Sequence, residues 1–203
     1  MQVVVMGVTG VGKSTVGRLL AEDIGARFVD ADDFHPPANV GKMRAGIALD
    51  DNDRAPWLAA LNALLTDAAR RGESLVLACS ALKGRYRQTL RAGVADFRLI
   101  HLGGSPALIA ERLGSRVGHY MNPALLESQL GALEVPADAI DLDIGPAPQE
   151  LARAACAALR RADAAASASA SAASESASAA SASAAAASAS AASTSNRLTG
   201  CAS

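Results

Sequence analysis

The sequence has few aromatic residues, few cysteines and almost no net charge. Aromatic residues make up 3% of the 203 residues, cysteine occurs three times, and the formal net charge is −1. Without an excess of basic residues, bulk attraction to nucleic acid or to an anionic membrane surface is excluded. Cys79, Cys156 and Cys201 are widely spaced and form no metal-ligand pattern, which favours reduced thiols. We therefore expect a cytoplasmic protein with neither a nucleic-acid nor a membrane partner.

Long hydrophobic runs are missing as well. The apolar stretch Gln2–Gly12 is short, has no basic residues before it and leads directly into Lys13. It therefore does not match a signal peptide or a membrane-spanning helix. The uncharged run Ser176–Asn196 is long enough to cross a bilayer, but it is rich in serine, which excludes a membrane helix.

Half of the residues count as hydrophobic, but a C-terminal segment inflates this figure. From Asp163 to Ser203 the chain is almost wholly alanine and serine, with one leucine and no aromatic residue. Such a segment cannot bury enough apolar surface to offset the entropy lost on ordering. The remaining residues, about 160, suit a single domain with its own core, and they carry 18 basic and 18 acidic residues. We predict one domain over residues 1–162 and a disordered low-complexity tail over residues 163–203.

Within the domain, apolar runs typical of buried strands alternate with patterns typical of amphipathic helices. This alternation predicts a three-layer α/β fold, with a five-stranded, mainly parallel sheet and helices on both faces. Ligands of such sheets bind beyond the carboxyl ends of the strands. We expect strands at Gln2–Val8, Ala26–Asp32, Leu75–Cys79, Phe97–Leu102 and Ala139–Ile144. We expect helices at Lys13–Gly25, Pro36–Ala45, Asp53–Gly72, Lys83–Ala92, Ser105–Leu113, Ala124–Leu133 and Pro148–Arg161.

Residues 7–14 match the phosphate-binding pattern G-x-x-x-x-G-K-[ST] without a misfit. Its glycines let the backbone N–H groups approach phosphate oxygens at the start of a helix, where the helix dipole also favours anions. Lys13 is expected to reach the β- and γ-phosphates, and the Ser14 hydroxyl is expected to hold Mg²⁺. Because the motif lies between a predicted buried strand and a helix, it predicts a P-loop NTPase-type fold. The predicted nucleotide-binding residues are Gly7, Val8, Thr9, Gly10, Val11, Gly12, Lys13, Ser14 and Thr15.

Two carboxylates, Asp30 and Asp32, end the predicted second strand. Residues two apart share one face of a strand, so the two side chains are expected to point together. One can orient Mg²⁺ through water, and the other can accept a proton from an attacking hydroxyl. The residues alone do not assign the two roles. The next residue, Asp33, is interpreted as a cap for the following helix.

More polar residues follow the second and third strands. The predicted helix at Asp53–Gly72 is preceded by acidic residues, of which Asn52 or Asp53 is expected to be the N-cap. Arg54 is unfavourable in a first helical turn, which favours a role in binding. Cations at the end of the third strand suit an anionic substrate, although a surface helix explains Arg87 equally well. Trp57 is interpreted as a core residue. The remaining polar candidates are His35, Asn39, Lys42, Arg44, Lys83 and Arg85.

Taken together, these motifs resemble the gluconokinase family of small P-loop sugar-acid kinases, over essentially Val3–Leu159. The resemblance rests on the P-loop in combination with Asp30-Ala-Asp-Asp-Phe-His-Pro36, Asp51-Asn-Asp-Arg-Ala-Pro-Trp57, Cys79-Ser-Ala-Leu-Lys83 and Gly118-His119. Two departures stand out. Tyr120 occupies a position where the family pattern has Phe, and the third strand ends in Cys79-Ser80 without the Asp of a standard Walker B motif.

The resemblance implies that the chain transfers the γ-phosphoryl group of MgATP to the 6-hydroxyl of D-gluconate, giving 6-phospho-D-gluconate and ADP. It implies a lid at about 114–123 whose closure excludes water, and it suggests a homodimer. The implied catalytic residues are Lys13, Asp30, Asp32 and Arg116. Arg112 and Arg116 would close over the nucleotide, and Ser14 would hold Mg²⁺ with Asp30 acting through water. The implied substrate-binding residues are Asp32, His35, Arg54, Lys83 and Arg87. The alternatives are another small-molecule kinase of this fold, such as a shikimate kinase, and a nucleotide-binding module without catalysis.

Overall fold

The computed structural model describes residues 1–114 and 123–169. The chain divides into two compact units, Met1–Ala158 and Leu159–Ser203. The first unit contains the strands and the helices α1 to α6. In the second unit the described residues, 159–169, are helical. Most of the predicted lid, including Arg116, and most of the predicted tail lie outside the described residues.

Five strands form one sheet in the order β2-β3-β1-β4-β5, and each neighbouring pair is parallel. This confirms the predicted α/β fold with a five-stranded parallel sheet. β1 and β3 are buried along their whole length, as expected for central strands covered on both faces. The strands are β1 (Gln2–Met6), β2 (Arg27–Asp30), β3 (Leu75–Ala78), β4 (Phe97–Gly103) and β5 (Ile140–Asp143).

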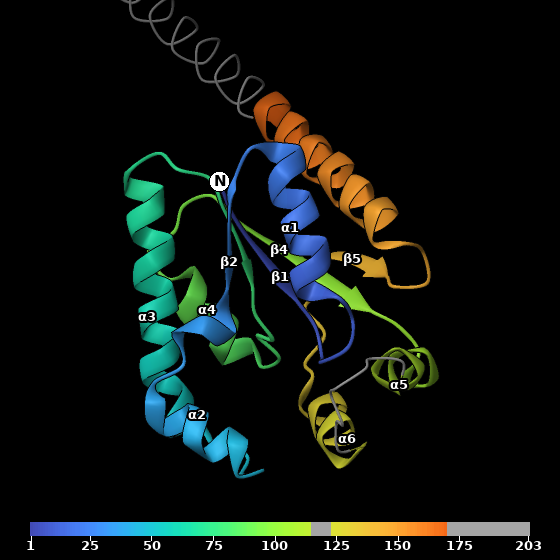
Figure 1. Cartoon of the computed structure of the whole chain (residues 1–203). Coiled ribbons are helices and arrows are strands. Elements are labelled where there is room, and N and C mark those ends of the chain that lie inside the picture. Colours follow the sequence, from blue (N-terminus) through green and yellow to red (C-terminus); the bar gives the residue numbers. More distant parts are fainter. Residues whose placement is uncertain (115–122, 170–203) are drawn as a thin grey trace, which may run out of the picture. The chain divides into compact units, whose positions relative to one another are not determined.

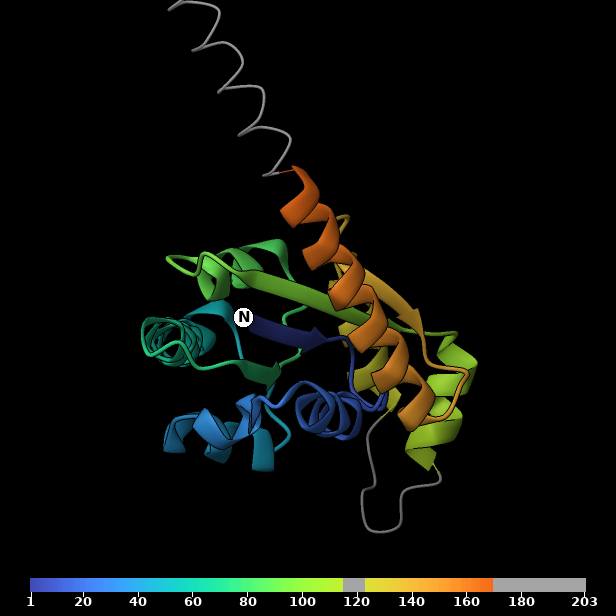
Figure 2. The same cartoon turned by 90° about the horizontal axis from the view of Figure 1, so that it is seen from above.

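Helices cover both faces of the sheet, as predicted. α1 packs against β1, β2 and β3, whereas α3 contacts β1 and α4 on the opposite side (Figures 1 and 2). The helices of the first unit include α1 (Lys13–Ile24), α2 (Pro37–Arg44), α3 (Asp51–Arg70), α4 (Gly84–Arg91), α5 (Pro106–Gly114) and α6 (Pro123–Ala132). Among the helices within the described ranges, none combines the length and the apolar character needed to cross a membrane.

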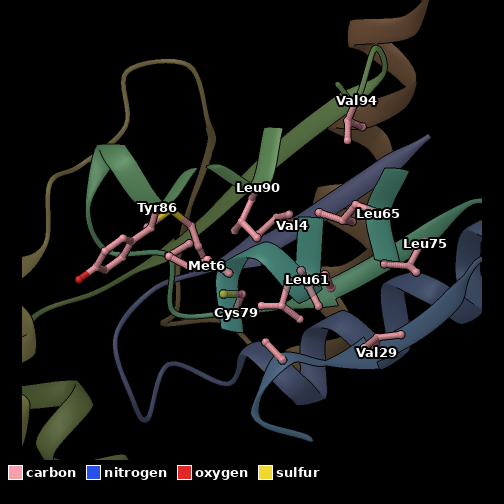
Figure 3. Close-up of a cluster of buried hydrophobic side chains, with 14 of the residues drawn as sticks. Val4, Met6, Val29, Leu61, Leu65, Leu75, Cys79, Tyr86, Leu90 and Val94 are labelled. Carbon is pink, nitrogen blue, oxygen red and sulfur yellow. The ribbon is translucent and has the colours of Figure 1, made fainter. Parts of the chain in front are cut away.

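The core on the α3 side of the sheet is a continuous apolar cluster (Figure 3). Leu61 and Leu65 of α3 are fully buried and belong to the same cluster as Val4 of β1 and Leu77 of β3. Their spacing of four residues places them on one face of the helix. Burying each such side chain contributes about 1.5–3 kcal/mol. The cluster therefore holds α3, and with it the polar start of that helix, against the sheet.

Two boundaries near the expected site differ from the prediction. β2 ends at Asp30, and a short 3₁₀ helix, η1 (Ala31–Phe34), replaces the last two residues of the expected strand. α3 begins two residues earlier than predicted, with Asp50 as its N-cap. The Asp50 carboxylate accepts from the Asp53 N–H at 2.8 Å, and the Asp53 carboxylate accepts from the Asp50 N–H at 3.0 Å. This reciprocal capping box satisfies two amides, so it excludes Asn52 and Asp53 as the N-cap.

The last described helix also differs from the prediction. It spans residues 148–169, whereas the expected helix ends at Arg161. The first part of the segment predicted to be disordered, residues 163–169, is therefore helical. Alanine has the highest intrinsic helix propensity, which allows an established helix to continue into this segment. The rest of the predicted tail, residues 170–203, lies outside the described residues.

The carboxyl ends of the parallel strands place several polar segments at one end of the sheet. The turn from β1 into α1 lies there, as do η1 and α2, which follow β2. Figure 1 shows this turn, α2 and α6 together at its lower end. Sheet topology therefore brings the phosphate-binding pattern and the acidic pair to the same edge, as expected from their positions after strands.

Candidate active site

The turn between β1 and α1 has the backbone geometry of a phosphate cradle. Gly7 has a φ of +141°, and a Cβ there would lie 2.5 Å from the carbonyl oxygen of Leu102. Gly10 has a φ of +84°, and its Cβ would lie 2.7 Å from Leu113 Cγ. Only glycine combines an unstrained positive φ with the absence of a Cβ, and both positions need both properties. Val8 and Val11 are buried, so their contribution to a phosphate site comes from the backbone.

The two polar side chains that end the motif are held by different partners. Lys13 Nζ donates to the carbonyl oxygen of Val8 at 2.9 Å, which folds the ammonium group back over the turn. Ser14 Oγ donates to Asp30 Oδ2 at 2.6 Å. The phosphate cradle and the acidic pair are therefore directly connected, although they are separated in sequence.

Asp30 and Asp32 do not play equivalent roles in the structure. Besides accepting from Ser14, Asp30 caps η1 by accepting from the backbone N–H of Asp32 at 3.2 Å. Asp32 lies within η1 rather than on the strand, and its side chain is 88% exposed. The prediction that a shared strand face aligns the two carboxylates is therefore wrong. The two aspartates are brought together by the helical turn η1, whose N-cap is Asp30 and whose first turn contains Asp32.

The charges around Asp32 shift its pKa. Although the Asp32 side chain is accessible to solvent, the protein atoms around it partly desolvate the carboxyl and raise its pKa above the ordinary value, and the negative charge of Asp30 raises the pKa further. Lys13 and His35 act in the opposite direction. A carboxylate with a raised pKa binds a proton more readily, as a group that accepts one from a substrate hydroxyl must. Asp33 does not cap α2, whose N-cap is Pro36, so that part of the sequence interpretation is wrong.

His35 packs between Trp57 and Asp32. Its ring stacks on Trp57 with centroids 4.3 Å apart and an interplanar angle of 12°. Its Nε2 lies 4.0 Å from Asp32 Oδ1. Desolvation lowers the pKa of His35, although the Asp32 charge opposes this effect, so the imidazole is neutral at pH 7. Among the described residues, the buried Nδ1 has no hydrogen-bond partner. Trp57 is 3% exposed, which confirms its prediction as a core residue.

Replacing Trp57 with phenylalanine is expected to lower the free energy of unfolding by about 1–3 kcal/mol. The indole Nε1 donates to the carbonyl oxygen of Ala31, between the two aspartates, at 2.8 Å. Phenylalanine keeps most of the apolar contact but leaves that buried carbonyl unpaired. Urea unfolding measures the change, with Ile47→Val at an exposed position as the matched control. Equal stability of Trp57→Phe and the control would show that this hydrogen bond contributes nothing.

A cationic cluster lies around Tyr86, at the start of α4. Lys83 Nζ donates to Asp51 Oδ1 at 3.1 Å, and Arg85 and the Tyr86 hydroxyl also donate to the Asp51 carboxylate. The charged groups of Arg54, Lys83 and Arg85 lie 5.6–5.9 Å from the centre of the Tyr86 ring. Hydrogen bonds from Tyr86 and Lys83 lower the pKa of Asp51. Three cations thus converge where sequence reasoning expects the acidic substrate.

The structure separates Arg85 from Arg87. Arg85 points to Asp51, whereas Arg87 donates to the backbone carbonyls of Ala81 and Leu82 at 3.0 and 2.9 Å. Residues two positions apart lie on opposite sides of a helix, so both could not face the cluster. Ala81 has a φ of +43°, and Arg87 supports this loop. The helical spacing after Gly84 was the signal that could have separated the two arginines in sequence.

Other predicted polar residues are used to join elements. Asn39 donates to the Asp53 carbonyl oxygen at 2.8 Å, and Lys42 forms a 2.6 Å ion pair with the Asp53 carboxylate. These contacts fasten α2 to the start of α3. Arg54 donates to the carbonyl oxygens of Leu49 and Asp50. Arg54 therefore supports the loop before α3 while its guanidinium also approaches Tyr86.

Of the two arginines predicted to contact the nucleotide, the structure describes one. Arg112, in the last turn of α5, donates to the Ile144 carbonyl oxygen at 2.5 Å. Arg116 lies outside the described residues. Cys79 follows β3, where a standard Walker B motif has an acid. Burial raises the pKa of its thiol to about 12, so Cys79 is uncharged at neutral pH.

The chain is similar to known proteins along most of its length. The AAA domain family matches residues 3–136. A probable gluconokinase of Rattus norvegicus is 43% identical over 177 residues, covering 77% of this chain and 96% of that relative. The gluconokinase of Gluconobacter oxydans is 48% identical over 135 residues, covering 66% and 76%. The crystal structure of a gluconokinase from Sinorhizobium meliloti matches with a TM-score of 0.73 and 42% identity, covering 79% of this chain and 91% of that one.

Proposed function

The chain belongs to the gluconokinase family, and from this premise we propose that it is an ATP-dependent carbohydrate kinase that phosphorylates D-gluconate. The γ-phosphoryl group of ATP is transferred to the 6-hydroxyl, giving 6-phospho-D-gluconate and ADP. The observation that carries this proposal is the 2.6 Å hydrogen bond between Ser14 and Asp30. It joins a phosphate cradle to a pair of carboxylates, which is the arrangement that transfer from a nucleotide to a hydroxyl requires.

The environments of the two aspartates support different roles. Asp30 already accepts two hydrogen bonds, from Ser14 and from the Asp32 amide, so its carboxylate is held in place. Asp32 is exposed and has a raised pKa. We therefore assign Asp32 as the group that accepts the proton of the attacking hydroxyl. Asp30 is assigned as the group that would orient Mg²⁺. Neutral His35, beside Asp32, is suited to hydrogen-bond another hydroxyl of the polyol.

The donor atoms next to the P-loop suit Mg²⁺. The Ser14 hydroxyl and the Asp30 carboxylate are hard oxygen ligands, and Mg²⁺ commonly takes one or two protein oxygens together with water and phosphate oxygens. Among residues 1–114 and 123–169, no three His, Cys, Asp or Glu side chains form a metal cage, which agrees with so small a protein contribution. Bound with ATP, Mg²⁺ would offset the negative charge of the phosphates.

The cationic cluster around Tyr86 supports recognition of an acid. Gluconate carries a carboxylate at the end opposite the 6-hydroxyl. Arg54 acts electrostatically on His35, which lies beside Asp32, and Lys83 lies near the same Tyr86 ring as Arg54. The pairing of Lys83 and Arg85 with Asp51 keeps both cations in place before substrate binds. We assign the carboxylate of the substrate to this cluster, with Arg87 as a support for the loop rather than a ligand.

A coupled assay that follows ADP formation tests the activity. With ATP and a panel of sugar acids, D-gluconate is expected to support turnover, whereas shikimate and neutral D-glucose are expected to give at least 100-fold lower kcat/KM. Shikimate lacks the flexible polyol chain, and glucose lacks the carboxylate that would bind the cationic cluster, so each loses contacts that favour gluconate in the transition state. Turnover with shikimate alone would favour the other kinase class. Nucleotide binding without turnover on any acid would favour a non-catalytic module.

A further inference from the structure

α6 and the residues that follow it contact both halves of the site. Gln129 Oε1, on α6, accepts from the backbone N–H of Thr9 in the P-loop at 2.7 Å. Five residues later, Glu134 contacts the loop that ends in Lys83. Neither residue lies near these partners in sequence: Gln129 and Thr9 are 120 positions apart. We call residues Gln129–Glu134 the strut.

Glu134 holds the peptide on both sides of Lys83. Its Oε2 accepts from the backbone N–H of Gly84 at 2.6 Å, and its own N–H donates to the carbonyl oxygen of Leu82 at 2.9 Å. Lys83 is the N-cap of α4 and makes no side-chain cap hydrogen bond, so the Glu134 carboxylate takes the place of a cap. A negative group at this end of a helix is also favoured by the helix dipole. The position of the Lys83 backbone therefore depends on Glu134.

The hydrogen bond between Glu134 and the Gly84 N–H requires a residue without a side chain at position 84. A Cβ at Gly84 would lie 2.9 Å from Glu134 Oε2, closer than ordinary carbon–oxygen contact. Its φ does not lie in the left-handed region, so backbone conformation does not require glycine here. The absence of a side chain is instead what admits the carboxylate. Leu133, between the two polar contacts, packs against the core cluster and anchors the strut.

We infer that Gln129 and Glu134 are positioning residues, which hold the phosphate cradle and the Lys83 loop at a fixed separation without touching either substrate. This inference rests on the proposed function, because it assigns the P-loop to ATP and Lys83 to the acid. Gln129 acts on the nucleotide through the Thr9 amide. Glu134 acts on the acid through the backbone around Lys83. Each end of the strut therefore has its own effect on one substrate.

The test is a comparison of KM values for the two substrates. Gln129→Met keeps the side-chain length but removes the acceptor, and it is expected to raise KM for ATP about fivefold with KM for gluconate within twofold of wild type. Glu134→Ala is expected to raise KM for gluconate about tenfold, with KM for ATP unchanged, because a charged acceptor is lost. Glu134→Gln, which keeps an acceptor oxygen, is expected to recover most of the loss. The exposed Glu127→Ala on α6 is the control and is expected to match wild type.

Gly84→Ala provides an independent test of the role of Glu134. Its added Cβ displaces the Glu134 carboxylate, so it is expected to raise KM for gluconate as Glu134→Ala does. In a Glu134→Ala background it is expected to have no further effect, since the group that it displaces is gone. Additive effects of the two changes would overturn the assignment of Glu134.

Two further measurements distinguish a loss of positioning from unfolding of a variant and from failure of the proposed function. Circular dichroism and thermal unfolding check that each variant is folded, with Gln129→Asn as a milder second variant. Equal changes in both KM values, or a change in Tm alone, would overturn the inference. ATP affinity measured by calorimetry does not depend on the acid. If wild-type protein does not turn over gluconate, the proposed function fails, but weaker ATP binding by Gln129→Met still supports that end of the strut.

Discussion

Replacement of Asp32 by asparagine is expected to lower kcat by about 10²- to 10⁴-fold, the range contributed by one positioned general base. Asparagine has nearly the same shape, so ATP affinity is expected to stay within twofold of wild type. The loss follows from chemistry, since an amide cannot accept the proton of the attacking hydroxyl. Steady-state ADP formation and ATP calorimetry measure the two quantities. Asp33→Asn, at the adjacent exposed carboxylate, is the matched control and is expected to keep kcat.

The raised pKa of Asp32 adds a pH dependence to this prediction. The carboxylate must be deprotonated to act, and a raised pKa means that it takes up a proton at a higher pH than an ordinary aspartate with its value of 3.8. The acid limb of the kcat/KM profile is therefore expected above pH 3.8, and activity is lost as pH falls through it. Circular dichroism across the same range separates this titration from acid unfolding. Near-normal kcat in Asp32→Asn would overturn the assignment of Asp32 as the base.

Replacement of Lys13 by alanine is expected to lower kcat by about 10²- to 10³-fold, the usual cost of removing one charged donor that stabilises a developing negative charge. In the structure the ammonium group donates to the Val8 carbonyl, so it already lies over the turn that cradles phosphate. The substitution removes the positive charge but keeps Gly7, Gly10 and Gly12, whose backbone conformation forms that turn. The fold is therefore expected to persist, with an unchanged circular dichroism spectrum.

Arg18→Ala is the control for Lys13→Ala. Arg18 lies one turn further along α1, is exposed and stacks over the Phe28 ring at 4.6 Å. Its removal takes away one positive charge from the same helix at a distance from the cradle. Wild-type kcat in Arg18→Ala, together with the loss in Lys13→Ala, would assign the effect to the position of the charge. Comparable losses in both variants would instead show that the overall charge of α1 matters.

Local sequence patterns predicted most of the fold. The apolar run before Gly7 and the alternation of strands with helices were sufficient for the parallel sheet, because burial on both faces leaves a continuous apolar signature. These patterns predicted the wrong boundaries where the side chains of a few residues stabilise a competing local structure. Asp30 caps Asp32, which turns the chain into η1, and Asp50 forms a reciprocal box with Asp53. In each case a side-chain hydrogen bond decided the boundary, and periodicity does not report such bonds.

The candidate site was predicted less completely. Asp32, His35, Arg54 and Lys83 were expected and are brought close together. The contacts that organise them were not predicted: those of Asp51, Arg85, Tyr86, Gln129 and Glu134. Asp51 and Arg85 were noted in the sequence, but their partners lie far away along the chain. A polar side chain such as Gln129 or Glu134 is usually exposed, so its residue type does not indicate such a contact.

The sequence by itself determined the phosphate cradle, the parallel sheet and the family, because each depends on contiguous residues or on regular spacing. The tertiary structure alone decided which arginine after β3 faces the cationic cluster, which aspartate is held by Ser14, and that α6 reaches the P-loop. These outcomes depend on contacts between residues 16 to 120 positions apart. Such contacts form only when the sheet has brought the ends of its strands together, so a local pattern does not show which residues meet. The helical spacing of Arg85 and Arg87, for example, places them on opposite sides of α4 but does not show which one faces Asp51.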